Sequence, residues 1–386
     1  AGGVGSGGSG LAEGTITGFG SVYVDGVRYD DSRAVLTQQG ASGEQAVSGL
    51  KLGQRVRVRS SATGVADSIE VITELIGPID SVEAFAGGQW LNVVGQRVRV
   101  DLSAAGSAGA DTWVDFGEAP CVAAANCVLQ PGQWVQVHGS WVLELASNRQ
   151  ILLASRVELI DPQASVLLSG IVRQVNGQSA RLNAADGREV DLSGAGGAAQ
   201  PALDQLLRVW IPAASVAAAR LPAARSVSSP LVADTSSSTA VLGGEVGKVS
   251  ADGAEIEIQG TRIAVPPGLR TSSPDLGQFA RVEIEKGPSG WQLKAAPELP
   301  DSAKRAGVQI SGDVPASLLL SAQSATWRLR DTALVRLTAK QIADGSCGGL
   351  RPSDRVRVDV QALRGQMPLR VESIRCSQAL SAATAR

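Results

Sequence analysis

Residues 14–30 read GTITGFGSVYVDGVRYD, and this stretch decides the fold class of the chain. Apolar and polar residues alternate on both sides of Asp25-Gly26. This alternation has the period of a β-strand, and Asp-Gly is a turn dipeptide that favours a two-residue hairpin. Glycines ahead of the hairpin indicate a bulge or sharp bend in the preceding strand. The stretch therefore predicts a bent strand that leads into a hairpin.

Three patterns of this kind recur in the same order along the chain. A glycine two residues ahead of Ile or Val starts the bent strand at Gly14, Gly77, Gly170, Gly244 and, more weakly, Gly312. The hairpin pattern recurs at 21–30, 90–101, 180–192, 255–265 and 325–337. The third pattern is a turn followed directly by a strand, and its turn positions are Gly53, Gly132, Asp204, Gly277 and Ser353. Repetition at a nearly constant period indicates that one unit was copied end to end.

Most copies add one further strand, as at 66–72, 152–160 and 368–376, which makes five strands in each unit. A bent first strand, a hairpin and two more strands follow the plan of an OB-like barrel. We therefore predict an all-β chain: a tandem array of about five small OB-like antiparallel barrels, each with its own core. Some modules should carry a short helix, and the candidates are 338–345 and 200–207. The predicted units are a Gly-rich N-terminal arm (1–10), module 1 (11–73), module 2 with a disulfide loop (74–161), a degenerate module 3 (162–230), module 4 (238–299), module 5 (306–378) and a C-terminal tail (379–386).

The charge balance bears on the expected partners. The formal net charge is −2, so the chain as a whole does not attract nucleic acid or an anionic membrane. No stretch of about 20 apolar residues occurs, which argues against a membrane-spanning helix. The expected partners are other proteins or further copies of the chain, with an acidic glycan or lipid headgroup as an alternative and with no nucleic acid. Membrane attachment is expected only through a lipid anchor upstream of Ala1.

The four cysteines fall into two local pairs, Cys121 with Cys127 and Cys347 with Cys376. Their spacing does not match a zinc site, so two disulfides are the favoured interpretation, and four buried thiols are the alternative. Disulfides form in oxidising compartments. The start of the chain, AGGVGSGGSG, has the composition of a flexible tether and is typical of a processed mature protein. We therefore expect a bacterial extracytoplasmic protein that is periplasmic, on the outer-membrane surface or secreted.

The first module also carries a family resemblance. GGVGSGGSG followed by GFGSVYVDGVRYD is similar to bacterial envelope and secreted proteins that carry the DUF5666 domain, and the similarity fades from module 2 to module 5. The resemblance implies repeated OB-like domains and a location outside the cytoplasm. It implies no catalytic residue, because the family has no assigned function.

Arginines at alternate positions are the most visible polar feature. Alternate residues of a strand share one face. The predicted anionic-ligand face therefore consists of Arg55, Arg57, Arg59, Arg97 and Arg99. A solvated strand face is the alternative interpretation. Nucleic-acid binding by stacking is disfavoured because these strands lack aromatic residues.

Other candidates for chemistry are weak. His138 is the single histidine, and with no second histidine we expect it at a strand end near the surface. Most tryptophans are expected in the barrel core or rim. The residues concerned are Trp90, Trp113, Trp134, Trp141, Trp210, Trp291 and Trp327. Accordingly, no catalytic, cofactor-binding or metal-binding residue and no cofactor is predicted, and the chain is not expected to be an enzyme.

These observations favour a non-enzymatic extracytoplasmic scaffold or interaction protein. A first alternative is a subunit of an extracellular polymer, filament or sheath, assembled by strand addition of the N-terminal arm. The arm residues concerned are Gly2, Gly3, Val4 and Gly5. A second alternative is an acidic glycan-binding protein.

Overall fold

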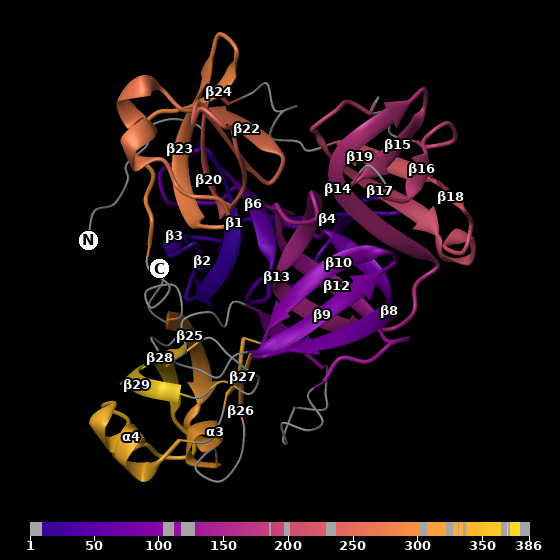
Figure 1. Cartoon of the computed structure of the whole chain (residues 1–386). Helices are drawn as coiled ribbons and strands as arrows, with labels where there is room; N and C mark the ends of the chain where they lie inside the picture. Colours follow the sequence, from indigo (N-terminus) through magenta and orange to yellow (C-terminus); the bar gives the residue numbers. More distant parts are fainter. Residues whose placement is uncertain are drawn as a thin grey trace.

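The computed structural model of the chain describes residues 10–102, 112–116, 128–184, 187–196, 201–228, 237–300, 307–321, 327–330, 332–334, 337–363, 369 and 371–378. These residues form mainly β-strands with a few short helices (Figure 1), so the predicted all-β class is confirmed. Modules 1 to 5 each begin with a long first strand, and we refer to them below as barrels 1 to 5. No helix among the described residues is long and apolar enough to span a bilayer.

Barrel 4 shows the repeated unit most completely. Its five strands close in the order β20-β21-β22-β24-β23-β20, in which β22 and β24 run parallel and the other neighbours antiparallel. This is the strand order of an OB barrel, with a short 3-10 helix between the third and fourth strands. Its elements are β20 (Thr239–Val249), β21 (Glu255–Ile258), β22 (Thr261–Ala264), η3 (Pro267–Ser272), β23 (Phe279–Gly287) and β24 (Gly290–Leu293).

Barrels 2 and 3 keep the same order. In barrel 3 two short strands, β18 and β19, together take the place of the fifth strand. Barrel 2 consists of β8 (Leu75–Phe85), β9 (Gly88–Val93), β10 (Gln96–Asp101), β11 (Trp113–Asp115), β12 (Trp134–Glu144) and β13 (Arg149–Ile160). Barrel 3 consists of β14 (Ser165–Asn176), β15 (Ser179–Leu182), β16 (Glu189–Asp191), β17 (Leu206–Pro212), η2 (Ala213–Ser215), β18 (Arg220–Pro222) and β19 (Arg225–Ser228).

Barrels 1 and 5 modify the plan. In barrel 1, β4 pairs in parallel with β7, so β3 and β4 together form the third strand, and β5 extends it as a hairpin. Barrel 1 consists of β1 (Gly10–Phe19), β2 (Val22–Val24), β3 (Val27–Tyr29), β4 (Val35–Gly40), β5 (Gly43–Ala46), β6 (Arg55–Ser60) and β7 (Ser68–Ile72). Barrel 5 consists of β25 (Gly307–Pro315), α3 (Ala316–Ser321), β26 (Trp327–Leu329), β27 (Thr332–Leu334), α4 (Ala339–Asp344), β28 (Arg355–Leu363) and β29 (Val371–Gln378).

The two predicted helices have different outcomes. Residues 338–345 do form helix α4, which begins with a capping box at Thr338. The prediction of a helix at 200–207 is wrong. Asp204 adopts a left-handed turn conformation, with φ at 62°, and the chain then enters β17, which pairs with β14. Tertiary pairing with an apolar strand overrides the local helix preference of this leucine-rich segment.

A bulge in the first strand explains the repeated glycine pattern. In barrels 1 to 4 the register of the first strand shifts directly after Ile16, Ile79, Val172 and Val246, the Ile or Val of each pattern. Before the bulge the strand pairs with the fourth strand, and after it with the second. The predicted bend is therefore confirmed, and it lets one strand close the barrel.

The turn before the fourth strand locks this bulge. In barrel 2 the Gly132 N–H donates to the Ile79 carbonyl, and the Ile79 N–H donates to the Gln133 carbonyl, both at 2.8 Å. The same reciprocal pair joins Gly53 and Gln54 to Ile16, Asp204 and Gln205 to Val172, and Gly277 and Gln278 to Val246. The first and third sequence patterns recur together because their backbones bond to each other.

The cores are not separate, which corrects the prediction of one core for each module. One apolar cluster spans barrels 1 and 5 and includes Trp113 of barrel 2, and a second spans barrels 2 and 3. A third consists of barrel 4 residues together with Leu11 of β1. The cause is pairing between first strands: β1 pairs in parallel with both β20 and β25, and β14 contacts β8. Barrel 1 therefore lies between barrels 4 and 5 (Figure 1), and sheets run from one barrel into the next.

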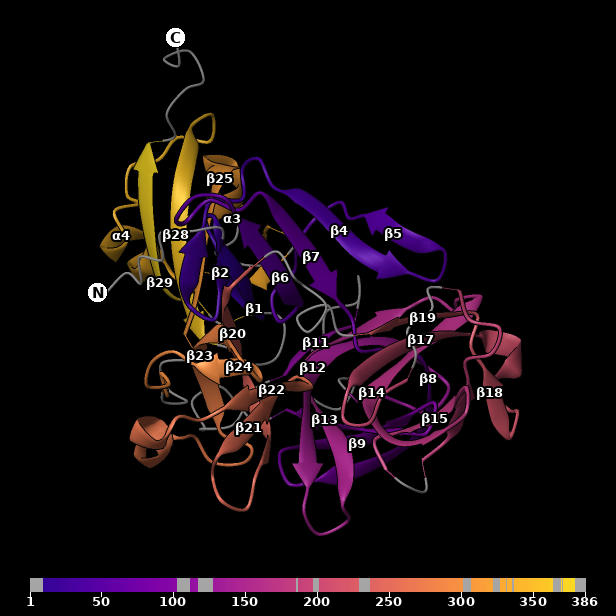
Figure 2. The same cartoon turned by 90° about the horizontal axis from the view of Figure 1, so that it is seen from above.

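Barrel 1 also contacts barrel 3 through the β4–β5 hairpin, which extends toward β19 and β17 (Figure 2). There the Arg225 guanidinium donates to the Gly40 carbonyl at 2.7 Å and to the Gln39 side-chain oxygen at 2.8 Å. In barrel 5 the predicted disulfide between Cys347 and Cys376 is present and joins the segment after α4 to β29. The other predicted pair, Cys121 with Cys127, and the arm residues Gly2, Gly3, Val4 and Gly5 lie outside the described residues.

Candidate functional site

The predicted arginine face divides into a buried part and an exposed part. Arg55 and Arg57 on β6 are buried, with 1% and 2% of their surface exposed, so neither belongs to a ligand face. The Arg57 guanidinium lies 2.5 Å from the Glu13 carboxylate and 3.2 Å from that of Glu70. Arg55 donates to the Gly243 carbonyl in barrel 4 at 2.6 Å. Both the ligand face and its solvated alternative are therefore wrong for these two residues, since neighbouring barrels cover the strand.

Glu13 is the carboxylate that compensates these charges. Burial alone would raise its pKa, but the adjacent Arg57 and Arg55 outweigh burial and hold the pKa below the usual range. The group therefore stays ionised inside the protein. Arg59, two residues further along β6, is exposed. On this strand Arg55 joins barrel 1 to barrel 4, whereas Arg57 pairs with carboxylates of its own barrel.

The exposed part lies on barrel 2. Arg97 and Arg99 on β10 keep 37% and 42% of their side-chain surface exposed. The Arg97 guanidinium stacks 4.4 Å from the Trp90 ring centroid, and that of Arg99 lies 4.9 Å from the Phe85 ring. Their own strand lacks aromatic residues, as expected, but β8 and β9 supply them across the sheet. We call these four side chains the barrel-2 arginine face. The pairing of Trp90 with Arg99 follows from the hairpin register, which the alternation in residues 90–101 could have indicated.

His138 is fully buried, which corrects its expected place near the surface. β12 continues past it to Glu144, so it lies in the middle of a strand and not at its end. Its Nδ1 lies 2.7 Å from the Ile72 carbonyl oxygen. Burial lowers its pKa to about 3, so the imidazole is neutral at physiological pH. Among the described residues no cluster of three or more His, Cys, Asp or Glu side chains could hold a metal ion.

A buried polar cluster around Glu74 was not predicted. The Glu74 side chain is 0% exposed, and its Oε1 lies 2.5 Å from the Arg208 guanidinium of barrel 3. The Ser169 hydroxyl of barrel 3 and the Trp141 indole N–H of barrel 2 donate to its Oε2. The Gln259 amide of barrel 4 donates to Oε1 at 3.2 Å. Glu74 lies between β7 and β8, and sequence alone gave no sign that three barrels would meet there.

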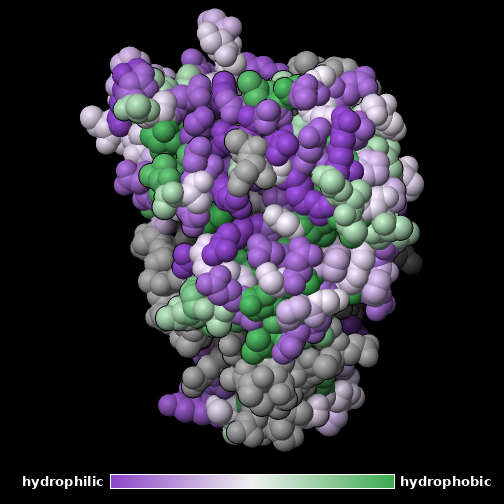
Figure 3. Space-filling view, turned by 45° about the vertical axis from the view of Figure 1, so that its right-hand side comes forward, coloured by the Kyte–Doolittle hydropathy of each residue, from purple (hydrophilic) through white to green (hydrophobic). Residues whose placement is uncertain are grey.

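The tryptophans mostly pack inside, as predicted. Trp113, Trp141, Trp210, Trp291 and Trp327 are buried, while Trp90 and Trp134 are half-buried. On the surface, hydrophobic residues form small groups among hydrophilic ones in the view of Figure 3. Within the described part of the chain, the exposed large apolar side chains are spread over four barrels: Val35, Val65, Val128, Leu145, Leu203 and Leu299. Scattered apolar residues of this kind are normal for a protein surface.

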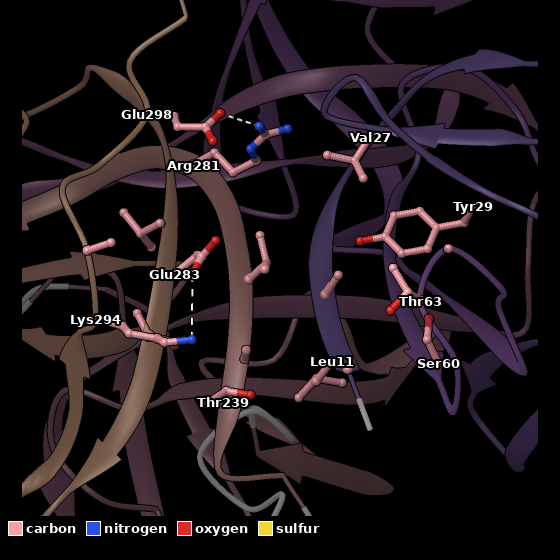
Figure 4. A pocket seen from close by; sticks show the side chains of 18 of the residues that line it. Leu11, Val27, Tyr29, Ser60, Thr63, Thr239, Arg281, Glu283, Lys294 and Glu298 are labelled. Atoms are coloured by element: carbon pink, nitrogen blue, oxygen red, sulfur yellow. Dashed lines mark hydrogen bonds and ion pairs between the residues drawn. The ribbon is translucent and has the colours of Figure 1, made fainter. Parts of the chain in front are cut away.

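A cavity of about 510 Å³ lies between barrels 1 and 4. We call it the interbarrel pocket. The starts of β1 and β20 contribute Leu11, Ala12 and Val241 to it. Barrel 4 contributes charged residues from β23 and from the segment after β24, and barrel 1 contributes Val27, Tyr29, Ser60 and Thr63 (Figure 4). Its volume falls in the range of about 300–1,000 Å³ that is typical of small-molecule sites.

Comparisons with known proteins add little to this description. No family model and no curated protein matches the chain. Among solved structures it matches drosophila Unr CSD456, which consists of cold-shock domains, with 11% identity and a TM-score of 0.15. The match covers 60% of this chain and 98% of that one.

The match corrects one expectation. We expected nucleic acid to be excluded as a partner, and the matched structure comes from an RNA-binding cold-shock domain protein. The exclusion is therefore withdrawn. A likeness of this size does not assign RNA binding to this chain, and the OB-like fold is established here by the strand order of the barrels.

Proposed function

We propose that this chain is a rigid, non-enzymatic scaffold that acts outside the cytoplasm and presents the outer faces of its barrels at fixed relative positions. The observation that carries the proposal is the contact of three barrels on Glu74. A carboxylate with no exposed surface is tolerated only when it is paired and hydrogen-bonded. Separating the barrels would remove Arg208, Trp141 or Gln259 from it.

Two further features support a fixed arrangement. The first strand β1 belongs to barrel 1 and also pairs with strands of barrels 4 and 5. The apolar clusters that join barrels 1 with 5 and 2 with 3 would be exposed if the barrels moved apart. Exposure of a shared core costs about 25 cal/mol for each Å² of apolar surface.

The compartment is supported by the disulfide. A bond between Cys347 and Cys376 is compatible with an oxidising environment. We propose a bacterial periplasmic, surface or secreted location, in line with the DUF5666 resemblance of module 1. Maleimide labelling of the protein as it is isolated, before and after reduction, tests this. Labelling of Cys347 without reductant would contradict the proposal.

Site-directed photo-crosslinking in the producing cells tests the scaffold role. A photoreactive residue replaces Arg97 on barrel 2, Arg270 on barrel 4 or Lys340 on barrel 5, all of which are surface positions. The proposal predicts a discrete macromolecular adduct from at least one of these faces, dependent on illumination. Absence of any macromolecular adduct from all three faces would contradict it.

A second candidate function is acidic-glycan binding at the barrel-2 arginine face. Arg97 and Arg99 favour it, because each guanidinium group stacks on an aromatic ring and stays partly exposed. A guanidinium group held in this way can bind a planar carboxylate of a glycan. Glu83 pairs with Arg97 and Asp101 pairs with Arg99, which reduces the net positive charge of the barrel-2 arginine face.

The test compares oligogalacturonate with single-stranded RNA of equal charge. The glycan should bind, and Arg97→Ala with Arg99→Ala should weaken its binding about tenfold. The control Arg270→Ala on barrel 4 should leave binding unchanged. Tighter binding of RNA than of glycan would overturn this second candidate in favour of a nucleic-acid interface.

A further inference from the structure

We propose that the interbarrel pocket binds a neutral six-membered sugar ring. The inference goes beyond the scaffold role and does not depend on it. It rests on three properties of the pocket: ion-paired charges on the wall from barrel 4, hydroxyl groups on the opposite wall beside one arginine, Arg28, and apolar residues in its lining.

The wall from barrel 4 is charged but internally neutralised. Arg281 forms an ion pair with Glu298, and Lys294 lies 3.9 Å from the Glu283 carboxylate. Figure 4 shows both pairs on the same side of the pocket. Because each cation already has its anion, the wall offers little net attraction to an anionic or cationic ligand. Each pair still presents N–H donors beside carboxylate acceptors, and a sugar hydroxyl can use both at once.

The spacing of the two pairs suits a ring. Arg281 and Glu283 are two residues apart on β23, so their side chains leave the same face of the strand. Two residues of an antiparallel strand span roughly 6.8 Å. Hydroxyl groups on opposite sides of a pyranose ring are separated by a comparable length, so one ring can reach both pairs.

The wall from barrel 1 complements such a ligand. The Tyr29 hydroxyl points across the pocket toward the barrel 4 wall, and Ser60 and Thr63 line the same side (Figure 4). The Ser60 hydroxyl oxygen is buried and has no hydrogen-bond partner among the described residues. Leu11 and Val27 contribute apolar surface. A pyranose has the matching pattern, with polar hydroxyl groups around its edge and C–H groups on its faces.

Saturation-transfer NMR and titration with the full chain test the proposal. The neutral probes are the methyl pyranosides of glucose, galactose, mannose and N-acetylglucosamine, and the anionic probe is glucuronate. We expect saturation transfer to at least one neutral pyranoside. Glu283→Gln should weaken the binding of that sugar about tenfold, since the substitution removes the charge that pairs with Lys294.

Two variants keep the result interpretable. Glu285→Gln is the matched control, because it makes the same change two residues further along β23 and outside the pocket lining. The Glu285→Gln variant should bind the neutral pyranoside with the same affinity as the unmodified chain. Tyr29→Phe removes a single hydroxyl and should weaken binding about threefold without disturbing the fold. The proposal is overturned if no neutral pyranoside receives saturation, if glucuronate binds more tightly than all of them, or if Glu285→Gln weakens binding as much as Glu283→Gln.

Discussion

The Glu74 carboxylate of the segment between barrels 1 and 2 lies 2.5 Å from the Arg208 guanidinium of barrel 3, and both side chains are buried. Burial would lower the pKa of Arg208, but Glu74 outweighs it and raises that pKa above the usual value. The Arg208 Nε has no hydrogen-bond partner among the described residues, so Glu74 is the main compensation of this buried charge. Loss of one partner of a buried pair leaves an uncompensated charge. Trp141 of barrel 2 and Gln259 of barrel 4 also donate to Glu74, so residues of three barrels meet at this pair.

Removal of Glu74 should be strongly destabilising. Glu74→Ala leaves the Arg208 charge buried without its carboxylate, and we expect a loss of about 3–5 kcal/mol in the free energy of unfolding. Urea denaturation followed by tryptophan fluorescence measures it. The control Glu83→Ala removes an exposed carboxylate that pairs with Arg97, and should cost less than about 1 kcal/mol. Equal costs for the two variants would contradict the role given to Glu74.

Glu257 should make stability depend on pH. It is 2% exposed, and neither carboxylate oxygen has a hydrogen-bond partner among the described residues. Burial raises its pKa to about 7, well above the value of an unfolded chain. The folded state therefore binds the proton more tightly. The stability that this group contributes is fully present below about pH 4, and is lost as pH rises through 7.

Glu257→Gln removes this titration. The stability of the variant relative to the unmodified chain should therefore rise by about 3 kcal/mol between pH 4 and pH 8. Denaturation of both proteins at several pH values provides the measurement. A difference that stays constant with pH would show that Glu257 is ionised and solvated in the folded protein.

The hairpin turn of barrel 3 carries a side chain that bonds back to the first strand. Asn183 adopts φ at 68°, and its Oδ1 accepts from the Ile171 N–H at 2.9 Å. Asn183→Gly keeps the conformation but loses this bond and those to Gln96 and Ser169, so we expect a loss of about 2–3 kcal/mol. Asn148→Gly is the control, since Asn148 has φ at 51° in an exposed turn. It should change stability by less than about 0.5 kcal/mol, and a similar loss in both variants would refute the hydrogen-bond explanation.

The disulfide should stabilise barrel 5. Cys347 and Cys376 are 29 residues apart, and a loop of that length gives an expected stabilisation of about 3–4 kcal/mol. Cys347→Ala together with Cys376→Ala should lower the free energy of unfolding by that amount. Addition of a reductant should lower the stability of the unmodified chain but not of the variant. Insensitivity of the unmodified chain to the reductant would contradict a structural role.

Local structure was largely predictable from the sequence. Each first-strand bulge follows a glycine pattern, and the Gly-Gln turn has a local reason as well. The Gln133 side chain accepts from the Gln130 N–H at 2.8 Å and so caps its own turn. Such bonds join residues that are close in sequence, so they leave a regular trace in a repeated unit.

Relations between barrels were not predictable in the same way. Arg55 and Arg57 have the pattern of a solvated strand, and only the position of barrel 4 shows that they are buried. His138 and Glu74 are buried for the same reason, since their partners lie in segments far away in the sequence. The interbarrel pocket likewise depends on the parallel pairing of β1 with β20, which no local pattern encodes.

The central claim is that the barrels form one fixed body, and small-angle X-ray scattering of the full chain tests it most directly. A compact chain of 386 residues has an expected radius of gyration of about 21 Å. The account predicts a value close to this and a scattering curve that the coordinates reproduce without any movement between barrels. A much larger radius, with a curve that only a mixture of barrel arrangements can fit, would show independent barrels on flexible linkers and would contradict it.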